Sequence, residues 1–192
     1  MDDIFVIGLR AEWLILILWW AWGLVGVKRA QRTEPAWKQL LLYWLPLIVA
    51  CGLLRPGGGA GWGPLGWPIL PHTTPVFGAA FALTTLGLLL ACWSRAVLGR
   101  NWSSVVQVKQ DHELVERGPY ARVRHPIYTG LLLMFAGSAV MIGEVRGGLA
   151  VLIVFASFWR KLRLEEAWLE TAFGPRYADY RRRTRALIPG LF

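Results

Sequence analysis

An uncharged stretch of 20 residues, Pro75–Ser94, constrains the fold more than any other feature of the sequence. A helix needs about 20 mostly apolar residues to cross the hydrocarbon core of a bilayer, and an uncharged run of this length is typical of such a helix. Four further apolar stretches occur, at residues 4–27, 39–54, 126–143 and 147–164. The sequence therefore predicts an all-α, polytopic membrane protein with about five transmembrane helices.

The composition supports this prediction and excludes several other classes of protein. Hydrophobic residues make up 55% of the chain and charged residues 17%, whereas soluble domains carry about a quarter charged residues. The 12 tryptophans point the same way, because indole rings favour the membrane–water boundary. These values exclude a disordered or collagen-like chain and argue against a water-soluble enzyme. Cys51 and Cys92 lie inside apolar stretches without a CxxC partner, so we expect packing residues.

The first stretch, residues 4–27, could instead be a signal peptide. Such a peptide has a basic N-terminus, but here Asp2 and Asp3 precede the apolar run. We therefore predict a retained helix, with Arg10 and Glu12 close enough to one end to reach the interface.

The last two stretches are predicted to form a hairpin. The segment 147–164 is uncharged only as far as Trp159, which is short for an independent span. It becomes a credible span as the return arm of residues 126–143, with a tip at Gly143–Gly148. A cytoplasmic C-terminal helix completes the single membrane-embedded domain that we predict for residues 1–192.

The distribution of basic residues predicts the orientation. All but three of the 21 Lys and Arg residues fall on one side of the membrane if the chain crosses five times, the exceptions being Arg10, Arg55 and Arg146. The positive-inside rule then places the N-terminus outside and the C-terminus in the cytoplasm. The net charge of +9 could suggest nucleic acid, but its placement between apolar runs argues against that partner. We expect a bacterial or archaeal cell membrane.

Polar and basic residues accumulate just before the fourth stretch. A Gly-Pro pair at 118–119 predicts a turn, and Pro126 suits the first position of a helix, where its missing N–H needs no partner. The helix would open at His125 with free backbone N–H groups, an arrangement that attracts an anion, and Arg122 and Arg124 would reinforce it. The alternative is an interfacial belt of Arg, Tyr and His that only anchors the helix.

Two adjacent glutamates form a second candidate cluster. Glu165 and Glu166 lie on an apolar stripe of helical spacing, where carboxylates are costly near a bilayer unless they meet a donor or a cation. Glu165 could pair with Lys161 one turn earlier, although this order is the weaker one. Because the hairpin turn is short, we expect Glu165 to return to the level of His125. Positive charge and a carboxylate at one site suit a zwitterionic ligand with hydroxyls. The three histidines lack the spacing of a zinc site, so no metal is predicted.

About the last 95 residues carry a pattern that resembles a known family. The pattern comprises His112-Glu113-Leu114-Val115-Glu116-Arg117-Gly118-Pro119-Tyr120, Arg124-His125-Pro126-Ile127-Tyr128-Thr129-Gly130, Glu165-Glu166, Phe173-Gly174, Tyr177, Tyr180, Arg183 and Ile188-Pro189. In order and spacing it resembles the isoprenylcysteine carboxyl methyltransferases, and phospholipid N-methyltransferases resemble the same pattern.

The resemblance implies a membrane-embedded methyltransferase that uses S-adenosylmethionine, with a cofactor-binding region at about residues 101–192. Carried over residue by residue, the cofactor contacts would be Gln107, His112, Glu113, Leu114, Val115, Tyr120, His125, Pro126, Ile127, Tyr128 and Glu165.

The resemblance also implies a substrate-binding set of Lys161, Arg163 and Glu166. In the family a basic residue one turn before the double glutamate faces the substrate carboxylate. Lys161 occupies that position where the family has arginine, and it lacks the bidentate fork, so Arg163 is the obvious substitute. The expected acceptor is a lipophilic or prenylated molecule that enters from the membrane lipids.

Three alternatives stay open at this point. A phospholipid N-methyltransferase has a similar pattern, and an amine acceptor would need a histidine or glutamate as base. An NADPH-dependent membrane reductase of the sterol-reductase type carries a similar Tyr–Arg–His–Pro–Tyr segment, although those enzymes are longer. A non-catalytic membrane scaffold could keep the architecture without turnover.

Overall fold

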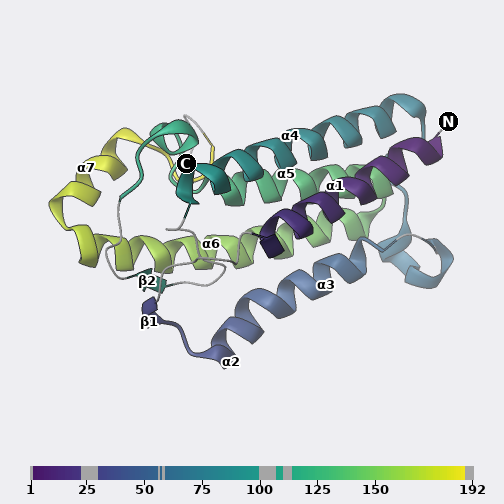
Figure 1. Ribbon diagram of the computed structural model, residues 1–192. Helices are drawn as coiled ribbons and strands as arrows, with labels where there is room; N and C mark the ends of the chain where they lie inside the picture. The colour runs from purple at the N-terminus through teal and green to yellow at the C-terminus, as the bar shows by residue number, and fades with distance from the viewer. Residues whose placement is uncertain are drawn as a thin grey trace.

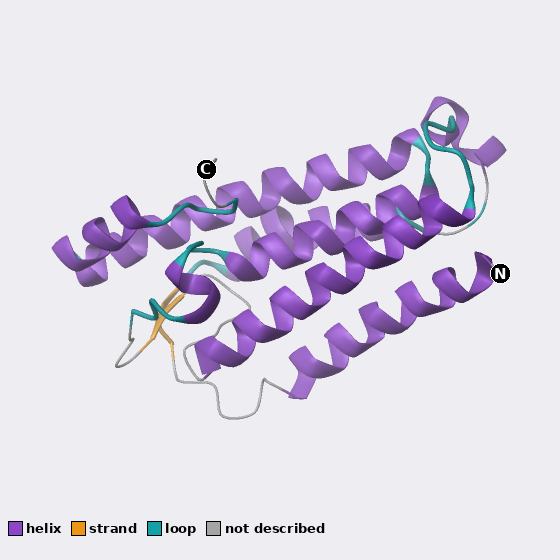
Figure 2. Cartoon of the chain, turned by 90° about the horizontal axis from the view of Figure 1, so that it is seen from above, coloured by secondary structure: helices purple, strands orange, loops and turns teal. Residues whose placement is uncertain are grey.

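A computed structural model describes residues 2–22, 30–55, 57, 59–99, 107–109 and 114–188 of the chain. Within these residues the chain forms a bundle of helices that run side by side (Figures 1 and 2). The helices are α1 Asp2–Trp22, α2 Ala36–Gln39, α3 Leu45–Leu53, α4 Thr74–Leu98, α5 Pro126–Ile142, α6 Val145–Phe173 and α7 Pro175–Arg183. A π-helical turn, η1 Leu40–Trp44, joins α2 to α3, and two 3-10 helices, η2 Gly59–Gly66 and η4 Gly118–Ala121, lie in loops. The prediction of an all-α fold is confirmed.

Two short strands are the one departure from helices and loops among the described residues. Strand β1, Ala30–Thr33, pairs antiparallel with β2, Gln107–Lys109, so that Thr33 lies opposite Gln107. Figures 1 and 2 place this pair at the same end of the bundle as α7. This strand pairing was not predicted from the sequence.

Three helical segments have the length and surface of membrane-spanning elements. Residues 3–22, 36–53 and 74–98 are long and apolar enough to cross a bilayer, and α5 is a shorter apolar helix. Apolar side chains point outward over the bundle, as Ile48 and Leu152 do with 62% and 65% of their surface exposed. Large exposed apolar surfaces of this kind are suited to lipid, so the chain is an integral membrane protein.

Glycines let α4 and α5 approach each other closely. A Cβ atom built on Gly130 would lie 2.6 Å from the carbonyl oxygen of Gly87, and one on Gly137 would lie 2.6 Å from that of Ala80. Small residues at such positions allow helix backbones to pack tightly within a membrane, where the hydrophobic effect contributes little to helix association. This contact fixes the rotation of α5, and therefore the direction of the side chains that follow His125.

Replacing Gly137 by alanine is expected to destabilise the protein by on the order of 2 kcal/mol, because two of the three nearest obstructing atoms belong to the α4 backbone. Thermal unfolding in detergent measures the loss. Gly78→Ala on α4 is the matched control, since a Cβ there meets nothing within 4 Å. A Gly137→Ala protein as stable as the wild type would mean that the two helices separate without cost.

Helix α1 docks on α4 and α5 through polar contacts in its middle. The hydroxyl of Thr85 hydrogen-bonds to Glu12 Oε1, and Trp13 Nε1 donates to Ser138 Oγ at 3.0 Å. Glu12 is 6% exposed, so the prediction that it reaches the interface is wrong. The hydroxyl of Thr85 on the facing helix donates a hydrogen bond to this carboxyl group. The hydrogen bond lowers the free-energy cost of burying Glu12 within the bundle.

The turn between α5 and α6 is shorter than predicted. Only Gly143 and Glu144 separate the two helices, because Gly143 adopts a left-handed conformation with φ of 65° and α6 already begins at Val145. The predicted tip at Gly143–Gly148 is therefore too long, because its last four residues already belong to α6. The short turn brings the far ends of α5 and α6 to one end of the bundle.

Candidate functional site

Several segments distant in sequence meet at the end of the bundle that carries α7 (Figure 1). After α7 the chain runs back along the residues that precede α5. Arg124 N donates to the Arg185 carbonyl at 2.7 Å, and His125 N donates to the Ala186 carbonyl at 3.0 Å. The backbone before α5 is thus held by the C-terminal segment, which fixes the starting point of the helix.

His125 lies between two adjacent glutamates of α6, Glu165 and Glu166. Its Nδ1 atom is 3.6 Å from Glu165 Oε2, and its Nε2 atom is 3.3 Å from Glu166 Oε1. Tyr128 donates from its hydroxyl to Glu165 Oε1 at 2.6 Å, and its ring stacks on His125 with centroids 5.5 Å apart. The expected return of Glu165 to the level of His125 is therefore observed.

Arg124 holds the second glutamate. Its Nε atom donates to Glu166 Oε1 at 2.7 Å, and its Nη1 atom donates to the Thr184 carbonyl at 2.6 Å. Burial by itself would raise the pKa of Glu166, but the hydrogen bond and charge of His125, followed by those of Arg124, outweigh burial and hold this pKa at about 2. Glu166 is therefore an ionised group that positions Arg124 and His125 and is already occupied by them.

The lowered pKa of Glu166 predicts an acid-labile contribution to stability. The ionised carboxylate is favoured in the folded state, so its contribution is fully present above pH 4.5 and is lost as the pH falls towards 2. The difference in unfolding free energy between the wild type and Glu166→Gln should be on the order of 3 kcal/mol near neutral pH and should shrink over that range. Thermal unfolding at several pH values tests this, and a constant difference would contradict it.

Lys161 is buried one turn before the glutamates. Its Nζ atom lies 5.4 Å from the ring centroid of Tyr43 and 5.4 Å from that of Tyr128. Arg163, by contrast, is exposed on α6 and lies outside this cluster. The fold therefore does not support the expectation that Arg163 substitutes for Lys161. Side chains two residues apart on a helix point in different directions, so Arg163 does not reach the position of Lys161.

Residues from the first half of the chain complete the site. Tyr43 donates from its hydroxyl to Glu34 Oε2 at 2.5 Å and accepts a hydrogen bond from Arg160 Nη1 at 2.7 Å. Arg160 Nη2 also lies 3.2 Å from Glu34 Oε1, which ties the segment before α2 to α6. These residues were not predicted from the sequence. One signal was present, because Glu34 is the only acidic residue between Glu12 and Asp111.

The other described residues expected at the site are located in the fold without a hydrogen bond to His125 or Glu165 that defines their role. Gln107 lies in β2, and Leu114 and Val115 are half-buried in the loop that follows. Tyr120 is buried in η4, where its carbonyl accepts a hydrogen bond from the Tyr180 hydroxyl at 2.7 Å. His112 and Glu113 lie outside the described residues.

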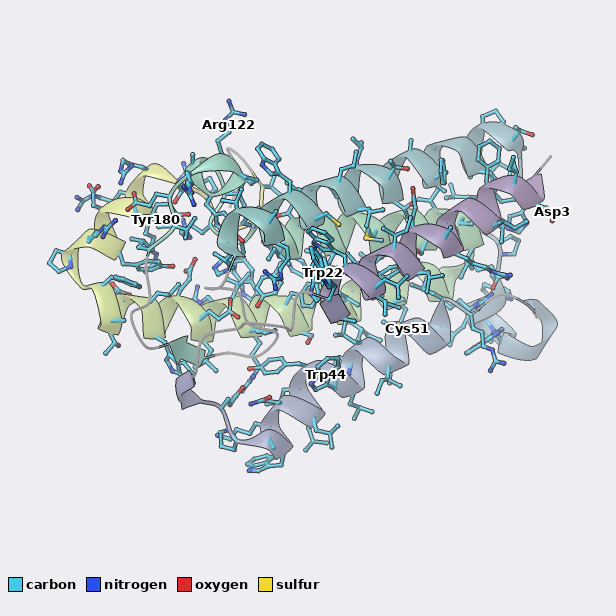
Figure 3. The ribbon with its side chains drawn as sticks, viewed as in Figure 1. Asp3, Trp22, Trp44, Cys51, Arg122 and Tyr180 are labelled. Atoms are coloured by element: carbon cyan, nitrogen blue, oxygen red, sulfur yellow. The ribbon has the colours of Figure 1, made fainter. Side chains whose placement is uncertain are left out.

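The start of α5 carries fewer positively charged side chains than expected. Pro126 is buried and Ile127 is half-buried, and the helix opens at His125 without a side-chain cap. Figure 3 shows Arg122 pointing away from the helices, so this residue does not reinforce the helix entrance. The charge at the entrance therefore comes from Arg124, beside His125.

The arrangement fits S-adenosylmethionine in its chemical character. A carboxylate at Glu165 and the faces of Tyr43 and Tyr128 suit a sulfonium cation, because both attract positive charge. His125 and the amide groups at the start of α5 offer donors to an anionic group or a hydroxyl. The cluster is thus able to hold a charged, hydroxyl-bearing ligand next to an apolar bundle.

Comparison with known proteins identifies a matching family. The sequence model of the family described as phospholipid methyltransferase matches residues 76–176, which include α5, α6 and all of α4 except its first two residues. The chain is 29% identical over 176 residues to the protein-S-isoprenylcysteine O-methyltransferase of Schizosaccharomyces pombe, covering 84% of this chain and 75% of the yeast protein. It is also 35% identical over 111 residues to the cobalt-zinc-cadmium resistance protein CzcN of Cupriavidus metallidurans, covering 57% of this chain and 50% of that protein.

The fold is shared with a solved membrane enzyme. The structure of the eukaryotic intramembrane Ras methyltransferase ICMT, isoprenylcysteine carboxyl methyltransferase, superimposes with a TM-score of 0.59 at 22% sequence identity. The superposition covers 82% of this chain and 54% of that chain, so the present chain spans about half of the solved structure.

Proposed function

The chain belongs to the phospholipid methyltransferase family, and from this premise we propose that it transfers a methyl group from S-adenosylmethionine to the carboxylate of an isoprenylcysteine-like lipid. The observation that carries the proposal is the cluster of His125, Glu165 and Tyr128 where α5 begins, beside the buried Lys161. The names of the relatives support the acceptor class, because several of them are isoprenylcysteine O-methyltransferases.

When bound, S-adenosylmethionine supplies a methyl group activated by a sulfonium. Glu165 would stabilise that positive charge, with Tyr128 fixing the carboxylate by its 2.6 Å hydrogen bond. His125 would donate to the polar part of the cofactor from the entrance of α5. The remaining proposed cofactor contacts are Gln107, His112, Glu113, Leu114, Val115, Tyr120, Pro126 and Ile127.

Lys161 would orient the acceptor. Its ammonium is the buried cation nearest to Glu165 along α6, and it would attract the carboxylate of an incoming lipid. A carboxylate is already ionised near neutral pH, so the reaction requires no general base. Lys161 would hold that carboxylate beside the methyl group that the cofactor would supply. The protein's contribution is therefore orientation and exclusion of water.

We propose that Arg124 and Glu166 act through His125 and do not contact the ligand. Arg124 already donates to Glu166 and to the Thr184 carbonyl, so its donors support the C-terminal segment. We assign both as positioning residues that hold His125, in place of the substrate contact expected for Glu166.

We propose that this site faces the cytoplasm and that the N-terminus lies outside. The positive-inside rule supports this orientation, because the end of the bundle that holds the site carries the arginines of α7. A reporter fused to the C-terminus should register as cytoplasmic, and an extracytoplasmic signal would overturn the orientation.

The experiment that tests the function uses detergent-purified full chain with labelled S-adenosylmethionine. S-farnesylcysteine with a blocked amine and a free carboxylate should gain label, whereas the matching carboxamide should not, because it lacks an ionised oxygen. Label that appears only in aminophospholipid would favour phospholipid N-methylation. Binding of NADPH without binding of S-adenosylmethionine would favour the reductase and contradict the proposal.

A further inference from the structure

Lys161 sits in a box that is built for a cation. Its Nζ atom lies 5.4 Å from each of two ring centroids, those of Tyr43 and Tyr128, and the residue is 8% exposed. Cations within about 6 Å of an aromatic face are attracted by the ring quadrupole, most strongly when water is excluded. We call Tyr43, Tyr128 and Glu165 the cation box.

The walls of the cation box are held by contacts that do not involve Lys161. The hydroxyl of Tyr43 is fixed between Glu34 and Arg160 at 2.5 Å and 2.7 Å. The hydroxyl of Tyr128 is fixed on Glu165 at 2.6 Å, and its ring stacks on Phe158 with centroids 4.9 Å apart. The box therefore keeps its shape whether or not the ammonium occupies it.

The chemistry of the cation box also suits a sulfonium. A sulfonium has no N–H or O–H to donate, so aromatic faces and a carboxylate are the groups that stabilise it. Tyr128 links these two elements, because its ring meets the Lys161 ammonium while its hydroxyl bonds to Glu165. Two positive charges in one box would repel each other, and the flexible four-carbon stem of lysine allows the ammonium to move.

We infer that the Lys161 ammonium is a tethered placeholder, which occupies the cation box and is displaced from it by the sulfonium of the cofactor. This inference rests on the proposed function. Once displaced, the ammonium is free to meet the acceptor carboxylate, so that cofactor binding prepares the protein for its substrate. After methyl transfer the sulfur of the product is uncharged, and the ammonium returns to the box without competition.

The inference predicts a change in ligand discrimination when the ammonium is removed. Lys161→Met should bind S-adenosylmethionine about fivefold more tightly relative to S-adenosylhomocysteine than the wild type does. The two ligands differ in the charge at sulfur and the transferred methyl group, so the ratio of their dissociation constants isolates that position. Isothermal titration of detergent-purified full chain measures both constants. Lys161→Arg is the matched control, and it should leave the ratio near the wild-type value.

A second variant keeps the test decisive if Lys161→Met does not fold. Tyr43→Leu removes one wall of the box and should weaken binding of S-adenosylmethionine more than that of S-adenosylhomocysteine. The inference would be overturned if the ratio of the two dissociation constants were unchanged in both variants. It would also be overturned if Lys161→Met lost the same affinity for both ligands, because Lys161 would then contact a group that the two ligands share. Wild-type protein that binds neither ligand would instead overturn the proposed function.

Discussion

Glu165→Gln is expected to reduce kcat/KM for methyl transfer by at least about 100-fold. Glutamine preserves the size of the side chain and its ability to accept the hydrogen bond from Tyr128, which is 2.6 Å long in the wild type. It removes the negative charge that we place beside the cationic sulfur. Charged hydrogen-bonding groups in such sites contribute a few kcal/mol, which accounts for an effect of this size.

The measurement is steady-state methyl transfer together with the affinity for S-adenosylmethionine. Glu170→Gln is the control, because Glu170 lies on the same helix, is 51% exposed and pairs with Arg181 at 3.6 Å. Its activity should remain that of the wild type, since exposed ion pairs contribute little. Equal activities for Glu165→Gln and Glu170→Gln would remove Glu165 from the proposed site.

Arg146→Met is expected to destabilise the protein by about 3–5 kcal/mol. Arg146 is 2% exposed, and its Nη1 atom donates to the carbonyls of Leu53 and Arg55 at 2.7 Å each. Its Nε atom donates to Glu144 at 2.5 Å, and its guanidinium lies 5.0 Å from the ring centroid of Trp62. Methionine fills part of the volume but leaves these acceptors unpaired, including a carboxylate that is 12% exposed.

Thermal unfolding followed by tryptophan fluorescence measures this loss. Arg55→Met removes a positive charge from the same end of the bundle, and its exposed side chain makes it the control that should stay near wild-type stability. Arg146→Lys should fall between the two, because one ammonium cannot reproduce the planar set of donors. An Arg146→Met protein of wild-type stability would refute the role assigned to this side chain.

The sequence by itself determined the positions of the long apolar helices and one contact between residues far apart in the chain, that of His125 with Glu165. The predicted stretch 126–143 corresponds to α5 at Pro126–Ile142, and 75–94 lies within α4 at Thr74–Leu98. Apolar runs and the proline at a helix start are local signals, so they can be read without knowing the fold. The meeting of His125 with Glu165 was also predictable, because a short turn forces the ends of a helical hairpin to the same level.

Only the tertiary structure decided which side chains face one another across helices. It selected Lys161 over Arg163 for the interior, added Tyr43 and Glu34 from the first half of the chain, and moved Glu12 from the interface to the middle of the bundle. These outcomes depend on the rotation and register of packed helices. Rotation and register are set by close contacts between segments far apart in sequence, and such contacts leave no periodic signal in the chain.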